Sequence, residues 1–291
     1  MLINLDFLQP GKPWPPPTEA ERLERYAQNR LLFEGRHEQV YKDWIRLLRE
    51  DQQATLEMVL NWHKRLTLLF ADLLLGEPPR ISAGDQDSPE QEAVERIIED
   101  NGLFNVAYEV ALDVSRYGTG IFKIRYDGRV IIEGQQPAIW FPVVKPDNIK
   151  EIQAHVLAWT YEEDTQERGK TVTKKYLQTE IHERGKITTA KYSIENNIIG
   201  PAIEQEETET GIDEFLVVPV NNVLTTDRVT GLDDYSDLDS IIQELETRIA
   251  QISRILDKHA DPNMYGPDTA LEHDPATGQW GYRGGGKYFP V

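Results

Sequence analysis

The chain has 291 residues, of which 39% are hydrophobic and 28% charged, so it can build buried cores for about two domains of ordinary size. Cysteine is absent, which excludes disulfides, zinc–thiolate sites and thiol nucleophiles. The formal net charge of −19 has the wrong sign for a protein that grips DNA phosphates, and no stretch is apolar for long enough to cross a bilayer.

The first residues predict an extended arm that leads into a helix. Five of the nine residues at 9–17 are proline, a composition typical of extended chain. Trp14 lies within this run, either as an anchor on a neighbouring molecule or in a loose tail. Thr18 and Glu21 then form a capping box, which opens a helix that runs to about Leu32.

Further helices are predicted from periodicity and from their end signals. Apolar residues at spacings of three and four indicate helices over 40–49, 55–75 and 106–117. His63 lies on the apolar side of the second of these helices and is expected to be a core histidine. Another helix starts at Ser88, where a proline follows the N-cap and a capping-box glutamine stands three residues later.

The hydrophobic period then changes to the alternation that is typical of strands. The expected strands are 121–126, 130–133, 140–144, 153–161, 173–181 and 186–194. Asp127-Gly128 predicts a tight hairpin turn, and further turns are expected at 167–169 and 184–185. The segment 204–214 holds six acidic residues and no basic one, which predicts a solvated, mobile loop.

A long helix is predicted over 236–260, with a length of about 37 Å at 1.5 Å per residue. Ser236 opens it as the N-cap, and Asp237 and Asp239 favour its first turn through the helix dipole. Its apolar residues are spaced four, three, four, three and four, a narrow seam typical of helices packed on like helices, although an ordinary core helix also fits. The seam consists of Leu238, Ile242, Leu245, Ile249, Ile252 and Leu256.

The sequence therefore predicts an α+β fold, with a helical N-terminal half, an antiparallel β-rich middle segment and a long helix near the C-terminus. No phosphate-binding loop or hydrolase elbow is present, and the six histidines lack metal-ligand spacing on one helix face. Asp147 and Glu151 form a carboxylate pair that a metal-dependent nuclease would need, but the neighbouring lysines do not follow the E-x-K pattern. We expect no enzymatic activity, no cofactor and no metal site.

Several short motifs, each of them weak by itself, follow one another in an order that is more informative than any single one. They are 26–30 with 33–37, the L-L-L-G-E-P-P run at 73–79, 111–124, the F-P-V run at 141–143, and Gly231 with the S-D-L run at 236–238. In this order they resemble portal proteins of tailed bacteriophages, of the type found in long-tailed phages. Two details differ: Phe33 replaces a tyrosine, and four residues separate Gly231 from Ser236.

The resemblance implies a wing, a stem helix and the start of a clip. It divides the chain into an extended arm at 1–18, a helical wing part at 19–150, a β-rich wing part at 151–230, the stem helix at 231–261 and the clip start at 262–291. Trp280 and Tyr282 are candidate clip contacts. Members of the family continue through a second stem helix, a tunnel loop and a crown, which this chain is expected to lack.

The resemblance also implies partners. About twelve copies would close into a ring by heterologous contacts at one capsid vertex of the virion, after assembly in the host cytoplasm. Double-stranded DNA would pass through without sequence-specific binding, while terminase, the head–tail adaptor, and capsid and scaffold proteins contact the ring; no membrane is involved. Two alternatives stay open: a metal-dependent phage nuclease, and another head-completion or minor capsid protein, which should lack the long seam-bearing helix.

Overall fold

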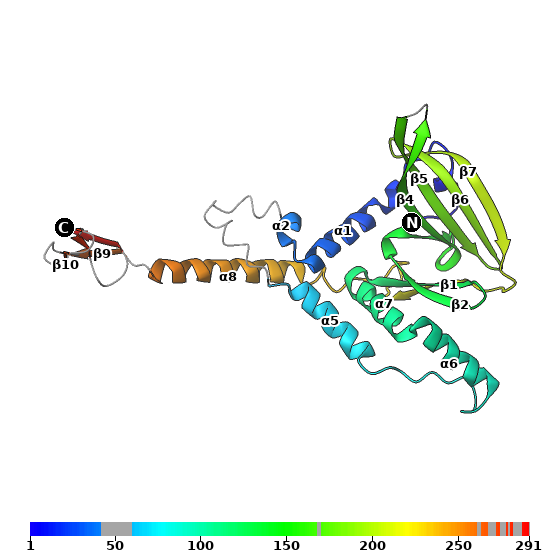
Figure 1. Cartoon of the computed structure of the whole chain (residues 1–291), viewed down its shortest axis with the longest axis horizontal. Helices are drawn as coiled ribbons and strands as arrows, with labels where there is room; N and C mark the ends of the chain where they lie inside the picture. The colour runs from blue at the N-terminus through cyan, green and yellow to red at the C-terminus, as the bar shows by residue number, and fades with distance from the viewer. Residues whose placement is uncertain are drawn as a thin grey trace. The chain divides into compact units, whose positions relative to one another are not determined.

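The computed structural model describes residues 1–41, 60–167, 170–260, 263–266, 272–273, 278, 280–281 and 287–290. The chain forms a larger unit of Met1–Glu34 with Asn61–Asp237, and a smaller unit of Gly35–Leu60 with Leu238–Val291. As predicted, the fold is α+β, with helices first, antiparallel strands in the middle and a long helix after them (Figure 1). Within the described ranges, no helix is long and apolar enough to span a bilayer.

The helices of the larger unit begin and end at residues with clear local signals. They are η1 (Asp6–Leu8), η2 (Pro17–Glu19), α1 (Ala20–Glu34), α5 (Trp62–Leu75), α6 (Pro89–Asn101) and α7 (Leu103–Tyr117), with η4 (Pro137–Ile139) between strands. Helix α6 ends at Gly102 and α7 at Gly118, and both glycines adopt the left-handed conformation that ends a helix without a steric penalty. The predicted helices at these positions are confirmed, but Thr18 does not cap α1: it lies inside η2, and α1 begins at Ala20.

Helix α5 begins later than the predicted residue 55. Leu60 and Asn61 are not helical, and the Asn61 side chain accepts a hydrogen bond from the Lys64 backbone N–H at 2.9 Å. Asn61 also donates to the Phe33 carbonyl at 2.8 Å, so it is fixed as an N-cap by two bonds. Residues 42–59 lie outside the described residues. Of the helix predicted over 40–49, only Val40 and Tyr41 are described: Val40 is the last residue of the short α2 (His37–Val40), and Tyr41 follows it as the C-cap.

Ser88 caps α6 as predicted, but the glutamine that follows acts differently. The Ser88 hydroxyl accepts from the Gln91 backbone N–H at 3.2 Å. The Gln91 side chain does not reach back to complete a capping box. Its carbonyl accepts from the Ala83 backbone N–H at 2.8 Å, and its amide donates to the Ile81 carbonyl at 3.3 Å. Gln91 therefore holds the preceding loop against the helix.

We expect Ser88→Ala to lower the free energy of unfolding by about 1 kcal/mol, because the Gln91 N–H at the helix start loses its acceptor. Urea denaturation followed by circular dichroism measures this change. Ser88→Thr is the matched control, since its hydroxyl restores the acceptor and should retain most of the stability. Equal losses in the two variants would mean that the cap contributes nothing.

The strands form two antiparallel sheets in the larger unit. The five-stranded sheet follows chain order, with β3 (Trp140–Lys145), β4 (Asn148–Glu167), β5 (Lys170–Glu183), β6 (Lys186–Glu195) and β7 (Ile198–Glu209). The three-stranded sheet has the order β2 (Val130–Gln135), β1 (Thr119–Tyr126) and β8 (Val217–Asn221). The hairpin predicted at Asp127-Gly128 is confirmed, because Tyr126 pairs with Val130. The turn at 184–185 is also confirmed, while residues 168 and 169 lie outside the described residues.

The five-stranded sheet is covered on both faces. Alternate residues of β4 point to opposite sides: Val156 packs with the N-terminal arm, and Leu157 packs with Ile121 of the three-stranded sheet. Helix α7 lies against the three-stranded sheet (Figure 1). Trp14 anchors the arm on the sheet of its own chain, with its ring centroid 5.0 Å from that of Phe141. The arm is therefore neither a loose tail nor held by a neighbour through Trp14, because the sheet offers an apolar face that the indole covers.

The acidic segment predicted as a mobile loop is instead largely an edge strand. Glu204, Glu206, Glu207 and Glu209 all lie in β7 and pair with β6. Lys186 of β6 lies 3.5 Å from Glu207, which offsets part of the repulsion among the acids. A charged edge also resists pairing with another copy of itself. Composition alone missed the strand because its stability comes from the neighbouring strand.

Candidate assembly site

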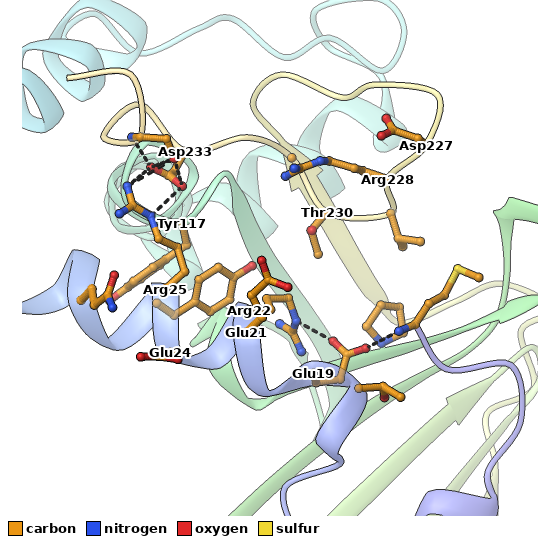
Figure 2. A pocket seen from close by; sticks show the side chains of 18 residues that line it. Glu19, Glu21, Arg22, Glu24, Arg25, Tyr117, Asp227, Arg228, Thr230 and Asp233 are labelled. Carbon is orange, nitrogen blue, oxygen red and sulfur yellow. Dashed lines mark hydrogen bonds and ion pairs between the residues drawn. The ribbon is translucent and has the colours of Figure 1, made fainter. Parts of the chain in front are cut away.

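Asp233 organises the last residues of the larger unit, just before the long helix. Figure 2 shows its carboxylate bonded to Arg25 of α1, at 3.0 Å from Nη2. The same carboxylate accepts from the backbone N–H of Tyr235 at 3.0 Å and of Ser236 at 2.8 Å. Although burial opposes ionisation, the bonds from Arg25 and Ser236 hold the pKa of Asp233 below its ordinary value.

Ser236 is not the N-cap of the long helix. Its hydroxyl lies 3.0 Å from an Asp233 carboxylate oxygen, and α8 (Asp239–Ala260) begins three residues later than predicted. Asp237, the other predicted start residue, is exposed and is the last residue of the larger unit. The N-cap prediction failed because the Ser236 hydroxyl is bonded to the carboxylate of Asp233, which lies three residues before it.

Tyr235 and Asp234 both bond to helices of the larger unit. The Tyr235 side chain is fully buried, shares a hydrogen bond of 2.7 Å with the Thr67 hydroxyl and lies edge-on to the ring of His63. His63 is thus the core histidine that its helix position predicts. Burial raises the pKa of Tyr235. Asp234 accepts from the Ser115 hydroxyl at 2.7 Å, so two consecutive residues fix the segment before α8 to α5 and α7.

Two glycines let the backbone segments of this region cross in direct contact. Gly118 has φ +78°, and a Cβ on it would lie 2.3 Å from the Gly231 carbonyl oxygen. A Cβ on Gly231 would lie 2.1 Å from the Gly118 carbonyl oxygen. The Gly231 N–H donates to the Thr119 hydroxyl at 2.9 Å, and the Asn222 N–H donates to the Gly118 carbonyl at 2.9 Å. Both glycines belong to the motifs that carry the family resemblance, and they meet in space.

A cleft of about 740 Å³ lies between α1 and the segment that precedes Ser236 (Figure 2). The charged groups of the N-terminal end of α1 that line this cleft form ion pairs within the larger unit. Glu19 accepts from Arg22 at 2.7 Å and lies 3.0 Å from the N-terminal amine, and Arg22 also donates to the Trp140 carbonyl at 2.9 Å. These contacts connect the arm, α1 and β3. This wall of the cleft therefore has a structural role, since its charged groups hold the three segments together.

One face of α8 is buried within the smaller unit. The buried Glu246 side chain contacts the buried His37 ring of α2, with 2.7 Å between Oε1 and Nδ1. Ile242 and Ala250 are buried on the same face. This side of α8 is therefore committed to packing within its own chain.

The predicted seam lies astride the boundary between the buried and the exposed faces of α8. Ile242 is buried, Leu238 and Ile249 are half-buried, and Leu245, Ile252 and Leu256 are exposed. Ile241 and Ile255, which the seam does not include, are 63% and 55% exposed. The exposed apolar side chains fall within an arc of about 100° on the helix. We call them the α8 stripe: Ile241, Leu245, Ile252, Ile255 and Leu256.

The predicted clip contacts fall at the end of the chain. Trp280 lies in β11 (Trp280–Gly281), which pairs with β10 (Glu272–His273), and Tyr282 lies outside the described residues. Nearby, β9 (Asn263–Gly266) pairs in parallel with β12 (Lys287–Pro290). The role of Trp280 and Tyr282 in clip contacts stays a prediction.

The carboxylate pair considered for a nuclease is Asp147 with Glu151. Asp147 lies in the turn between β3 and β4, and the Glu151 carboxylate is paired with Lys145. Among the described residues, no three histidine, aspartate or glutamate side chains are grouped so that they could hold a metal ion.

An acidic α+β chain whose long helix exposes an apolar stripe has the features of a subunit of a protein assembly. Residues 17–268 match the family of phage portal proteins described as SPP1 Gp6-like. The chain belongs to this family, which confirms the resemblance seen in the sequence and gives it a role as a phage portal protein. No curated protein matches the chain at a significant level.

Proposed function

We propose that this chain assembles into a ring at one capsid vertex, through which double-stranded DNA passes during packaging and ejection. Terminase and the head–tail adaptor dock on the ring, which also contacts capsid and scaffold proteins. The proposal rests on family membership and on one observation, the α8 stripe. Five large apolar side chains on one helix face are a surface that gains stability when another protein covers it.

In this proposal the regions have separate roles. The arm at 1–18 and the wing parts at 19–150 and 151–230 form the outer body, the region 231–261 with α8 is the stem, and 262–291 begins the clip. The chain is a structural component of the virion and performs no catalysis. This role agrees with the structural character of the family.

The charge of the chain supports a conduit that does not grip DNA. Fifty acidic residues against 31 basic ones give a net charge of −19. An acidic channel wall repels phosphates and lets DNA slide, and salt screens this repulsion beyond about 8–10 Å. Copies of such a chain also repel one another, so ring formation requires apolar contacts such as those of the α8 stripe.

We expect Leu245→Asp to weaken subunit association, because the stripe contact would bury an unpaired carboxylate. The apparent dissociation constant should rise by at least about tenfold, corresponding to 1.4 kcal/mol. Light scattering after size exclusion measures the oligomer, and negative-stain microscopy should show rings with a central hole for the wild type.

Ser240→Asp is the matched control, because it adds the same charge at an exposed position of α8 outside the stripe. Circular dichroism should show both variants folded. An unchanged oligomer in Leu245→Asp would remove the stripe from the interface. A wild type that stays monomeric at high concentration would overturn the ring itself.

A further inference from the structure

A second apolar stripe lies on α5, in the larger unit. Trp62, Leu66, Leu69 and Leu73 are between 36% and 80% exposed. They follow one another at spacings of four, three and four residues, so they share one helix face within an arc of about 60°. We call these four residues the α5 stripe. The opposite face of α5 is buried: His63, Thr67 and Ala71.

The two stripes have matching repeats. In α8, Leu245, Ile249, Ile252 and Leu256 are also spaced four, three and four; Ile249 is half-buried and the other three belong to the α8 stripe. Each set covers about 16 Å of helix. Helices with this repeat pack by placing the side chains of one between those of the other. The apolar residues of α5 and α8 have the same spacing and cover the same length of helix, as this packing requires.

The charges beside the stripes favour one orientation. Asp72 on α5 and Arg248 on α8 are both exposed and each stands directly before an apolar position of its repeat. When the helices run antiparallel, these two positions lie on the same flank of the contact, so the Asp72 carboxylate faces the Arg248 guanidinium. Within the chain Asp72 accepts from the Tyr108 hydroxyl at 2.8 Å and Arg248 donates to Glu244 at 2.7 Å, and both side chains stay exposed. A parallel alignment places Asp72 and Arg248 on opposite flanks of the contact, so the two charges do not meet. Charge complementarity therefore selects the antiparallel arrangement.

The stripes are different surfaces on one chain. A contact between two unlike surfaces is heterologous, and repeated from copy to copy it generates a ring when the rotation closes. We propose that the α5 stripe is the docking surface for the α8 helix of a second copy of this chain, packed antiparallel. The inference rests on the proposed ring, because it names the surface that the α8 stripe meets there.

Disulfide cross-linking tests this pairing, since the natural chain has no cysteine. The antiparallel register places Leu66 of one copy opposite Ile252 of another. Two differently tagged full-length chains, one with Leu66→Cys and one with Ile252→Cys, are expressed together and oxidised. A mixed-tag dimer should form about tenfold more than with the control pair Leu66→Cys and Ser240→Cys, because a disulfide needs Cα atoms within about 7 Å.

Each outcome has a distinct meaning. Mixed-tag dimers from Leu66→Cys with Ile252→Cys support the pairing. Predominant cross-linking between two Ile252→Cys chains within intact rings would show α8 packed on α8, which overturns the inference and leaves the ring in place. A third chain carries both Leu66→Cys and Ile252→Cys; if it cross-links only within itself, α5 is covered by its own α8 and the inference is overturned. Monomers without rings would overturn the proposed function as well.

Discussion

Gly231→Ala is expected to prevent stable folding of the larger unit. The new Cβ would lie 2.1 Å from the Gly118 carbonyl oxygen and 3.0 Å from the Asn222 backbone nitrogen. Both are backbone atoms, and the Asn222 N–H is bonded to that same carbonyl at 2.9 Å, so relief of the clash breaks the crossing. We expect a loss of more than about 4 kcal/mol, measured as the free energy of unfolding in urea.

Gly128→Ala is the matched control for this change. Gly128 has φ +68° in the β1–β2 turn, and a Cβ there meets no atom within 4 Å. Its cost is the left-handed backbone penalty alone, about 1–2 kcal/mol. If Gly231→Ala were no more destabilising than Gly128→Ala, the close approach of the two motif glycines would not limit stability.

Signals that act within a few residues predicted most elements of the fold. Gly102 and Gly118 end their helices, Ser88 caps α6, and Asp127-Gly128 turns the first hairpin, all as expected. Each of these features depends on the φ angle or hydrogen bonds of the residue itself. Strand β7 was missed because its acidic sequence is stabilised by pairing with β6, which no local pattern encodes.

The candidate interface was only partly predictable for a similar reason. A repeat of four and three locates the apolar residues of α8, but it does not tell which side its own chain will cover. That side is the one on which Glu246 contacts His37, two residues that are far apart in the sequence. Neighbouring apolar residues, as at Ile241-Ile242 and Ile255-Leu256, were the available sign of a second apolar face.

The larger unit is expected to lose stability as the pH falls from about 6.5 to 4, through His155 of β4. The ring is buried, its Nδ1 accepts from the Trp140 indole N–H at 3.0 Å, and it lies opposite His182 across β4 and β5. Burial, and secondarily the charge of His182, lower the pKa of His155 from 6.5 to about 4. Protonation at Nδ1 would turn this acceptor into a donor, so that the His155 N–H and the Trp140 indole N–H would point at each other.

The direction of the pH effect follows from proton uptake. Below pH 6.5 the unfolded chain binds a proton at residue 155 that the folded chain excludes until about pH 4. The free energy of unfolding is therefore fully retained above pH 6.5 and falls by roughly 3 kcal/mol on the way to pH 4, at about 1.4 kcal/mol per pH unit. Nearby, bonds from His182 and Lys123 outweigh burial and hold the pKa of Glu180 below 4.5, so its contribution is lost only at lower pH.

The variant His155→Gln distinguishes the loss of stability caused by protonation of His155 from the loss caused by protonation of other groups. Glutamine offers Trp140 an acceptor and does not titrate, so the variant should lack the loss of roughly 3 kcal/mol that the wild type shows between pH 6.5 and 4. Urea denaturation at several pH values measures the difference, and an NMR titration of the imidazole gives its pKa directly. Parallel stability curves for the two proteins, or an imidazole that titrates near 6.5, would show that the buried ring is readily protonated in the folded chain.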